Sequence, residues 1–556
     1  MRSSRAVDIA LVAILVTGVG LFVAYPLALI LGRGLMGEDG LTLSLLGEVW
    51  SSYRLSLEHS VATSLLCALL TTAGSLAVAL VVTTRRGIAK TLLRAGVLVS
   101  MVSPPFIASL AYIQLYGRRG WITHGLLGLS MNPYGFWGIV LMQTVSFIPL
   151  GALLLIGVLE KLDLDSVKAA RDLGARPAHV LRDVVLRLVA PGIVVVALLT
   201  LARSLADFGT PAIIGGRYNT LASDIYLKLI GYSNLEMAAA MNIYLLLPSV
   251  AAFWGYRVLM RRSDRTVSSA RARTGSIDLR LASCGPLGWL ALGASALFYV
   301  VSALQYACIF AAGFVRRTAA GYVPTLEYWN EFLSVDGATF ARSVTYGLVV
   351  SLVGTLFALV LAYYVNRRRI RGAALLDLVS ALPFIVPGPC FGLGYILAFN
   401  SAPLKLTGTA LIVMACMLFK QLPTTSRIGA AALAQIPDEL ERSVHDLGGT
   451  RLAALRDVIL PQMRPAFFTC FAYAFSSCMT TAGAIIFLVS PGSQVAVFAL
   501  FDAAYTGDYA VASLIAAAII VVTVAVDGVA FALAGRGAPG GKGSGGRGSR
   551  GEGETR

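Results

Sequence analysis

Charged residues are scarce in this chain of 556 residues: only 13% are aspartate, glutamate, lysine or arginine, whereas 57% are hydrophobic. A soluble protein of ordinary composition carries roughly 25% charged residues. So few charges cannot keep this much apolar surface in water, and we expect lipid to surround most of the chain. The composition therefore excludes an ordinary water-soluble globular protein.

Patterns typical of metal sites, disulfide frameworks and catalysis are also missing. The seven cysteines are scattered without a C-x-x-C pair, and the four histidines have no metal-ligand spacing. We therefore expect no bound metal or cofactor, and we interpret the cysteines as small buried hydrophobic residues. No group of histidine, cysteine and carboxylate residues has catalytic spacing, so a membrane-embedded enzyme is disfavoured.

The formal net charge of +16 does not indicate a nucleic-acid-binding protein. The basic residues form short clusters between apolar stretches, as at Arg85-Arg86, Arg261-Arg262 and Arg367-Arg368-Arg369. This distribution is typical of a membrane protein whose cytoplasmic loops are basic, and not of a continuous surface that follows a phosphate backbone. We therefore expect lipid, and no nucleic acid, as the surroundings of this chain.

Twelve apolar segments have the length of about 20 residues that a membrane-spanning helix needs. They predict an all-α membrane protein with about twelve transmembrane helices. The first is too long for a signal peptide, and we expect it to be retained. The segments lie at roughly 7–31, 61–83, 92–116, 135–159, 188–207, 238–260, 284–314, 344–365, 373–399, 407–432, 466–489 and 510–534.

The positions of the basic residues predict the orientation in a bacterial inner membrane. With both termini in the cytoplasm, the clusters at 85–90 and 367–371 and the loop at 160–187 are cytoplasmic, as the positive-inside rule requires. Arg118-Arg119 and Arg316-Arg317 are then external, against the rule. The majority of the basic clusters favours this orientation.

The chain contains an internal repeat. Residues 149–191 and 423–465 align without a gap, and both contain the sequences DLG and LRDV. Upstream, SPPFIASLAY (103–112) is echoed by LPFIVPGPCFGLGY (382–395). We infer two homologous six-helix halves, an arrangement that many transporters have. The predicted division is a first half at 1–262, a cytoplasmic linker at 263–283, a second half at 284–535 and a disordered glycine-rich tail at 536–556.

The repeat includes two polar loops, residues 160–187 and 434–461, which we call the paired loops. Each interrupts the apolar pattern with a stretch that is compatible with a helix and contains a glycine, Gly174 or Gly448, suited to a tight break. A short exposed helix between two membrane helices acts as a lever on them. One such loop is compatible with an ordinary connector, but two matching copies favour a mechanical role.

These loops resemble the EAA loop of permeases from ABC importers, whose pattern is E-A-A-x3-G-x9-I-x-L-P. The matching positions are Lys168, Ala169, Ala170, Gly174, Val184 and Leu186 in the first copy, and Arg442, Ser443, Val444, Gly448, Val458, Leu460 and Pro461 in the second. Lys168 replaces the glutamate, Arg187 replaces the proline, and Glu441 stands one place early. The resemblance implies that both loops contact a cytoplasmic ABC ATPase, present in two copies, and that the chain itself catalyses no reaction.

The sequence is consistent with this division of labour. It has no G-x-x-x-x-G-K-[ST] phosphate-binding loop, because Gly543 follows the lysine of GAPGGKGS (537–544) and no strand precedes that segment. We therefore expect ATP to be used by the partner subunit. We find no large extracytoplasmic domain, so we expect a separate substrate-binding protein to capture the cargo.

Two further segments, 205–226 and 476–513, resemble fused permeases of the ferric-iron importer group. This resemblance implies ferric iron as the cargo, a hard cation suited to oxygen ligands. Thiamine and aminoethylphosphonate remain alternatives, because related permeases for them contain similar segments. A secondary transporter driven by an ion gradient is the alternative class, although it does not need paired loops.

Polar residues within the apolar segments are candidates for the translocation path. Arg203 and Asp207 are four residues apart on one face of the predicted fifth helix and could pair, and Lys420 lies in the middle of a segment. The repeat places Thr480 and Thr481 opposite Ala206 and Asp207. A structural role for these residues stays open. Prolines 104, 105, 383, 387 and 389 predict breaks in the third and ninth helices, which should face the cavity between the halves.

Overall fold

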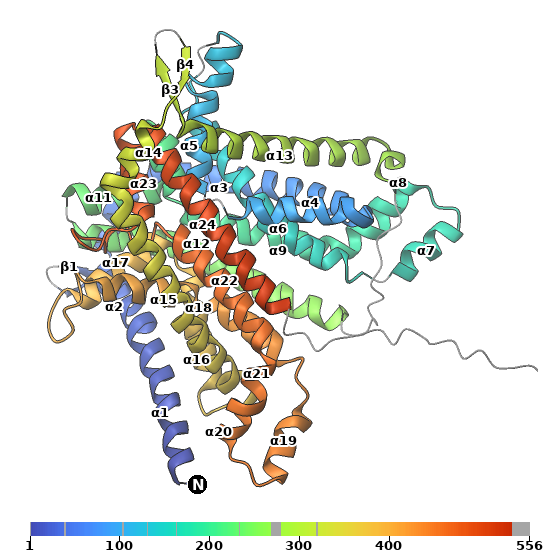
Figure 1. The fold of residues 1–556 in the computed structure, drawn as a ribbon, viewed down its shortest axis with the longest axis vertical. Coiled ribbons are helices and arrows are strands. Elements are labelled where there is room, and N and C mark those ends of the chain that lie inside the picture. Colours follow the sequence, from blue (N-terminus) through green and yellow to red (C-terminus); the bar gives the residue numbers. More distant parts are fainter. Residues whose placement is uncertain are drawn as a thin grey trace, which may run out of the picture.

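A computed structural model describes residues 2–37, 40–102, 105–129, 132–162, 164–232, 234–267, 280–318 and 321–535. The chain folds into helices with two short β-hairpins, in which Met36 pairs with Leu41 and Val315 pairs with Pro324. Two arms of long helices diverge from a common centre (Figure 1). The predicted tail at 536–556 and most of the predicted linker lie outside the described residues.

The first part of the chain contains the elements α1 Arg2–Val19, η1 Gly20–Ala24, α2 Tyr25–Leu35, β1 Met36–Gly37, β2 Gly40–Leu41, α3 Ser44–Thr84, α4 Gly87–Ser100, α5 Pro105–Tyr116, η2 Trp121–Leu126, α6 Phe136–Leu159, α7 Leu164–Asp172, α8 Pro177–His179, η3 Val180–Val185, α9 Leu186–Ala206, α10 Gly209–Ile214, α11 Leu221–Tyr232 and α12 Leu235–Val267.

The second part contains the elements η4 Leu281–Cys284, α13 Gly285–Ala312, β3 Val315–Thr318, β4 Gly321–Pro324, α14 Glu327–Glu331, η5 Phe332–Asp336, α15 Gly337–Ala362, η6 Tyr363–Arg367, α16 Ala373–Ile385, α17 Gly388–Phe399, α18 Ala410–Leu433, α19 Asp438–Asp446, α20 Arg451–Ala453, η7 Ala454–Ile459, α21 Leu460–Gln462, α22 Arg464–Thr480, α23 Ala496–Thr506 and α24 Tyr509–Gly535.

The internal repeat is visible in the boundaries of the helices. The helices α6, α7 and α8 begin and end at positions equivalent to those of α18, α19 and α20 under the alignment of 149–191 with 423–465. The helices α9 and α22 also end at equivalent residues, Ala206 and Thr480. Both α6 and α18 contain an internal proline, Pro149 and Pro423, at the same place. The two halves therefore share one fold.

The predicted fold class, an all-α membrane protein in two halves, is confirmed. Helices occupy all twelve apolar segments, and eight helices of the described residues are long and apolar enough to cross a membrane. The helices α16 and α17 would form a ninth span if counted together, although the direction of the chain bends by 116° between them. This bend confirms the break predicted at the prolines of 373–399. Ser103 and Pro104 lie outside the described residues, and α5 begins at Pro105.

The span predicted at 466–489 is wrong at its C-terminal end, because α22 ends at Thr480. The apolar residues that follow form turns, and Ala484, Ile485 and Leu488 are buried in the protein. Irregular backbone at membrane depth is tolerated where protein covers it. The apolar composition of residues 481–489 therefore does not distinguish a buried turn from a lipid-facing helix.

The two halves exchange their first helices. The N-terminal elements α1, η1 and α2 contact α16, α17 and α18 of the second half, whereas α13 contacts α3 and α5 of the first. Tyr299 and Tyr306 on α13 donate hydrogen bonds to the carbonyl oxygens of Leu93 (2.9 Å) and Val99 (2.7 Å) on α4. Tyr395 on α17 donates to the carbonyl oxygen of Phe22 in η1 at 2.9 Å. Neither half is therefore complete without the other.

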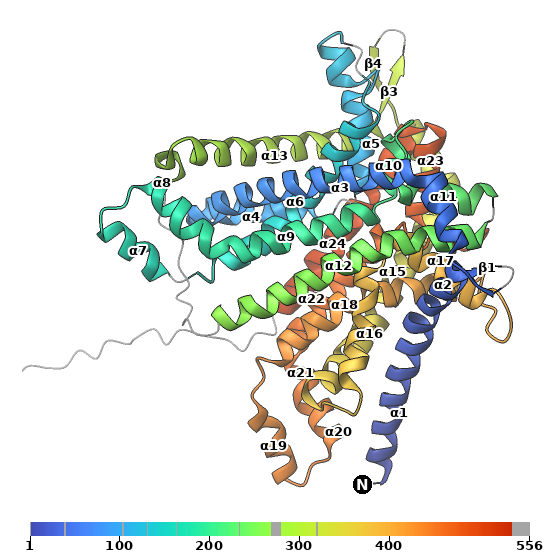
Figure 2. The same cartoon turned by 180° about the vertical axis from the view of Figure 1, so that it is seen from behind.

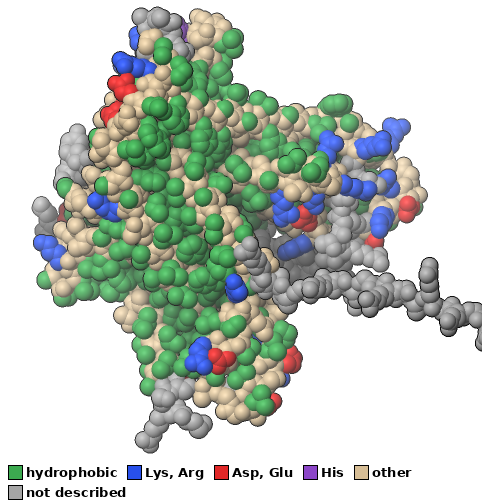
Figure 3. All heavy atoms as spheres, in the orientation of Figure 1, with side chains coloured by type: hydrophobic (Ala, Val, Ile, Leu, Met, Phe, Trp, Pro, Cys, Tyr) green, Lys and Arg blue, Asp and Glu red, His purple; other side chains and the backbone are tan. Residues whose placement is uncertain are grey.

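The paired loops lie at the far ends of the two arms. Figures 1 and 2 show α7 at the tip of one arm and α19 at the tip of the other, with β3 and β4 at the opposite side of the molecule. Charged side chains gather near these tips, and hydrophobic side chains cover much of the surface between them (Figure 3). All seven cysteines are free and buried, as predicted from their apolar surroundings.

Candidate functional site

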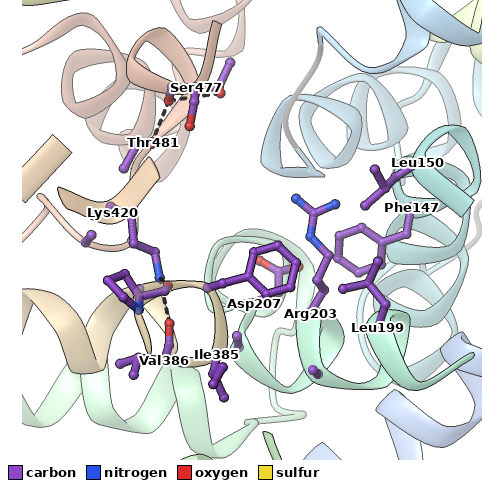
Figure 4. Close-up of a pocket in the computed structure, with 18 of the residues that line it drawn as sticks. Phe147, Leu150, Leu199, Arg203, Asp207, Ile385, Val386, Lys420, Ser477 and Thr481 are labelled. Carbon is purple, nitrogen blue, oxygen red and sulfur yellow. Dashed lines mark hydrogen bonds between the residues drawn. The ribbon is translucent and has the colours of Figure 1, made fainter. Parts of the chain in front are cut away.

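A cavity of about 380 Å³ lies where the two arms meet. Its walls come from α6, α9 and α12 of the first half and from α16, α17, α18 and α22 of the second, so both halves form it. The five residues predicted to lie on the path, Arg203, Asp207, Lys420, Thr480 and Thr481, all line this cavity. Figure 4 shows Arg203 and Lys420 on opposite sides of its central space.

The predicted ion pair between Arg203 and Asp207 is wrong: no salt bridge joins them in the part of the chain that the structure describes. Helix α9 ends at Ala206, and Asp207 has extended backbone angles (φ −78°, ψ 113°). The spacing of four residues therefore no longer brings the two side chains together, as it would within a continuous helix.

Asp207 instead holds the start of α10. Its Oδ1 accepts hydrogen bonds from the backbone N–H groups of Gly209 (3.1 Å) and Thr210 (3.3 Å). Its Oδ2 accepts one from Nε2 of Gln143 at 3.0 Å, and Gln143 Oε1 accepts one from Ser204 at 2.6 Å. Carboxylates are favourable at helix N-termini, where N–H groups lack partners within the helix. Asp207 therefore ties α9, α10 and α6 together.

Replacing Asp207 with alanine is expected to lower the free energy of unfolding by about 2–4 kcal/mol, because three donors lose their acceptor. A double-mutant cycle with Arg203→Ala should give a coupling energy of at most about 0.5 kcal/mol, since the two side chains do not pair. Denaturant unfolding of the purified chain in detergent measures both values. Thr481→Ala is the matched control, because the Thr481 hydroxyl donates only within its own helix, to Ser477. A coupling energy well above 1 kcal/mol would show that Arg203 and Asp207 form an ion pair after all.

Lys420 stabilises the break between α16 and α17. Its Nζ donates hydrogen bonds to the carbonyl oxygens of Pro383 (2.8 Å) and Val386 (2.6 Å). In a continuous helix the Pro383 carbonyl would accept from residue 387, which is a proline and has no N–H. The lysine supplies the missing donor from a neighbouring helix (Figure 4), and it also lies 5.6 Å from the ring centre of Phe391.

Thr480 and Thr481 lie at the end of α22, at the positions equivalent to Ala206 and Asp207 at the end of α9. Their hydroxyls donate to the carbonyl oxygens of Ser476 (2.8 Å) and Ser477 (2.6 Å), so they satisfy the helix end locally. Thr481 has nearly the same backbone angles as Asp207, φ −76° and ψ 111°. The helix therefore ends at the equivalent residue in both halves, but the first half carries a carboxylate there and the second half carries hydroxyl groups.

A cluster of aromatic rings joins the halves behind the cavity wall. Phe208 lines the cavity and lies 5.4 Å from Tyr226 and 5.8 Å from Phe501, between ring centres. Tyr226 also lies 6.0 Å from Phe487. Gly483 permits this packing, because a Cβ there would be 3.1 Å from the Phe208 ring. The sequence analysis missed this cluster, since its members are far apart in the chain.

The paired loops have the same local geometry. Gly174 and Gly448 adopt positive φ angles of 79° and 77°. The N–H of Ala175 bonds to the carbonyl of Ala170 (3.1 Å), and that of Gly449 bonds to the carbonyl of Val444 (2.8 Å). This is the hydrogen bond that ends a helix in the Schellman motif, in which glycine is favoured. The second copy therefore keeps the backbone of the first despite its different residues.

The remaining predicted loop residues surround these turns. Lys168 is largely exposed and lies 3.6 Å from Asp165, and Leu186 begins α9. Ser443 donates to the carbonyl of Glu439 at 2.9 Å. The other predicted residues are Ala169 and Ala170 on α7, Arg442 on α19, and Leu460 and Pro461 in α21. Sequence reasoning missed Leu173 and Leu447, which stand next to the two glycines and are each 88% exposed.

The second paired loop is attached to the rest of the chain through α19. Arg367 at the end of η6 forms salt bridges to Asp438 (2.5 Å) and Glu441 (3.3 Å) of α19. Glu441 also accepts a hydrogen bond from the Tyr363 hydroxyl at 2.8 Å. The glutamate that stands one place early in the predicted motif is therefore bound within this chain. These contacts fix α19 to the end of a long membrane helix.

Comparison with known proteins decides the family. The model for the family described as "Binding-protein-dependent transport system inner membrane component" matches the chain twice, at residues 49–265 and 351–536. This chain belongs to that family. The two matches correspond to the two halves of the fold, and they place the chain among inner-membrane components of transport systems, as the sequence predicted.

Individual relatives are transport permeases and not enzymes. The ferric transport system permease protein FbpB of Actinobacillus pleuropneumoniae is 30% identical over 440 residues, 77% of this chain and 63% of the relative. A putative ferric transport system permease protein FbpB 1 of Haemophilus influenzae is 31% identical over 409 residues, 71% and 64% of the two chains. This chain thus spans slightly less than two thirds of both.

A shorter relative matches part of the chain. The putative 2-aminoethylphosphonate transport system permease protein PhnV of Salmonella typhi is 29% identical over 243 residues, which are 42% of this chain and 92% of the relative. A single half of the fused fold therefore has about the length of this relative.

Proposed function

We propose that this chain is the membrane-spanning permease subunit of an ATP-driven importer and that its cargo is ferric iron. The observation that supports this most strongly is the pair of family matches on two halves that together enclose one cavity. The relatives named for ferric transport favour iron. The cavity would be exposed alternately to the two sides of the membrane, and the aromatic cluster around Phe208 would close it toward α11 and α23.

A separate cytoplasmic ATPase, in two copies, would drive the change between these states. Each copy would dock on one of the paired loops, with Leu173 or Leu447 as an apolar contact that is exposed in the isolated chain. A partner that covers such a leucine removes its apolar surface from water, which favours docking. The α7 and α19 helices, at the ends of the arms, would transmit the motion to the helices that line the cavity.

An extracytoplasmic binding protein would deliver the cargo at the opposite side. Both termini would be cytoplasmic, and the β3–β4 hairpin would then face the binding protein. We expect no resident cofactor, and ATP would be bound only by the partner subunit. Among the described residues, no group of three or more histidine, cysteine or acidic side chains is placed to hold a metal ion.

Uptake by reconstituted vesicles tests this function. Vesicles containing this chain, its ATPase and its binding protein are expected to accumulate labelled ferric iron only when ATP is present. Aminoethylphosphonate, suggested by the Salmonella relative, and thiamine are the competing cargoes. ATP-dependent uptake of either one, without uptake of iron, would reject ferric iron as the cargo. Uptake by this chain alone, driven by an ion gradient, would reject the whole mechanism.

A further inference from the structure

The described lining of the cavity contains more cationic than anionic side chains. Among the described residues of its walls, Arg203 and Lys420 are the cations and Asp207 is the single carboxylate. The formal charge of the lining is therefore +1. A charged lining of one sign attracts cargo of the opposite sign, and a low-dielectric wall strengthens this field. The lining is therefore positive, whereas a bare metal cation requires a negative lining.

The hydrogen bonds within the cavity increase this imbalance. Both oxygens of Asp207 already accept N–H donors, from Gln143 on one side and from Gly209 and Thr210 on the other. Tyr473, the only phenol among the described lining residues, donates its hydroxyl to Thr424 at 3.2 Å. A hard trivalent cation prefers anionic oxygen ligands. The described part of the cavity offers it no carboxylate that is free of other partners.

Arg203, in contrast, is available to a ligand. Its guanidinium carries five N–H donors, and no hydrogen bond or salt bridge engages them within the part of the chain that the structure describes. The Phe147 ring centre lies 5.7 Å from its Cζ, and Tyr473 and Asp207 interact with its charge electrostatically without a hydrogen bond or salt bridge. The side chain is exposed to the cavity, and Figure 4 shows it extending into the central space. Lys420 faces it from the other half and has already used two of its three donors.

We propose that this cavity admits its cargo as an anion, with Arg203 as the residue that binds the anionic oxygen atoms. A planar guanidinium binds carboxylate, phosphate and similar groups through two parallel hydrogen bonds. A ferric ion would then cross the membrane within a complex of net negative charge and not as a bare cation. This inference rests on the proposed role of the cavity as the cargo path, but not on iron being the cargo.

Binding to the full chain in lipid nanodiscs tests the proposal without its partners. Inorganic phosphate serves as the anionic probe, and hexaamminecobalt(III), a stable trivalent complex, serves as the cationic probe. Calorimetric titration is expected to show saturable binding of phosphate and none of hexaamminecobalt(III). Binding of the cobalt complex without binding of phosphate would overturn the proposal.

Variants identify the binding residue. Arg203→Gln should weaken phosphate binding by about tenfold or more, and Arg203→Lys should restore part of it, since it keeps the charge but loses the planar donor pair. Arg217→Gln is the matched control, because Arg217 is exposed in the same half and does not line the cavity. Equal phosphate binding by the wild type and Arg203→Gln would place the anion elsewhere and overturn the proposal.

The two proposals fail in distinguishable ways. Vesicles that take up aminoethylphosphonate and not iron would reject the ferric cargo but agree with an anion-binding cavity. Vesicles that take up iron, combined with a chain that binds no phosphate, would support the importer and reject the anionic form of its cargo. Arg203→Gln is further expected to reduce vesicle uptake while leaving the amount of inserted chain unchanged.

Discussion

Lys420→Met is expected to abolish transport and to lower the free energy of unfolding by about 3–6 kcal/mol, because a hydrogen bond to a charged group contributes about 1.5–3 kcal/mol and two are lost. Methionine has a similar length, so the packing changes little. The carbonyl oxygens of Pro383 and Val386 would then have only cavity water as a donor. The α16–α17 break, which forms part of the cavity wall, should lose its fixed shape.

The measurements for Lys420 are vesicle uptake and denaturant unfolding in detergent. Lys420→Arg keeps the charge and the donors on a planar group, and it should give an intermediate result. Lys405→Met is the matched control, because Lys405 is an exposed lysine in a loop of the same half. If Lys420→Met unfolds and transports as the wild type does, the lysine does not support the break.

Features that depend on local sequence were predictable. The twelve apolar segments all contain helices, since an apolar stretch in lipid must satisfy its backbone hydrogen bonds internally. The break at Pro387 followed from the missing N–H, and the glycine turns of the paired loops followed from the preference of glycine for positive φ. The repeat was visible as an ungapped alignment and reappears in the helix boundaries.

Features that depend on contacts between distant segments were not predictable. The exchange of α1 and α13 between the halves leaves no periodic signal, because an apolar helix has the same composition whichever half it covers. The pairing of Arg203 with Asp207 assumed a continuous helix, whereas α9 ends one residue before Asp207. The partner of Lys420 could not be found from spacing, since its acceptors lie more than thirty positions away.

The same limit applied to the paired loops. The sequence indicated a glutamate displaced by one place, but it did not show that Glu441 bonds to Arg367 and Tyr363. It also gave no reason to single out Leu173 and Leu447, since leucines are common next to glycine. Only their exposure distinguishes them from the buried leucines of the core. Exposure depends on the surroundings of a residue in the fold and not on its type.

Gly174→Val and Gly448→Val are each expected to abolish ATP-dependent uptake while leaving the chain inserted. Both glycines have φ angles near 80°, a conformation that costs other residues about 1–2 kcal/mol and β-branched residues more. A Cβ at either position would have no neighbour within 4 Å, so the effect comes from the backbone and not from a collision. The end of α7 or α19 should change direction and move its exposed leucine away from the docked position.

Two substitutions separate this conformational effect from a loss of stability or of surface shape. Gly174→Asn should retain most of the uptake, because asparagine tolerates the left-handed region although its side chain is about as large as that of valine. Gly128→Val, which imposes the same strain at a φ of 64° in open space outside the paired loops, should leave uptake unchanged. Vesicle uptake and co-purification of the ATPase are the measurements. Full uptake by both loop valine variants, with normal ATPase binding, would mean that the turns do not set the position of the docking surface.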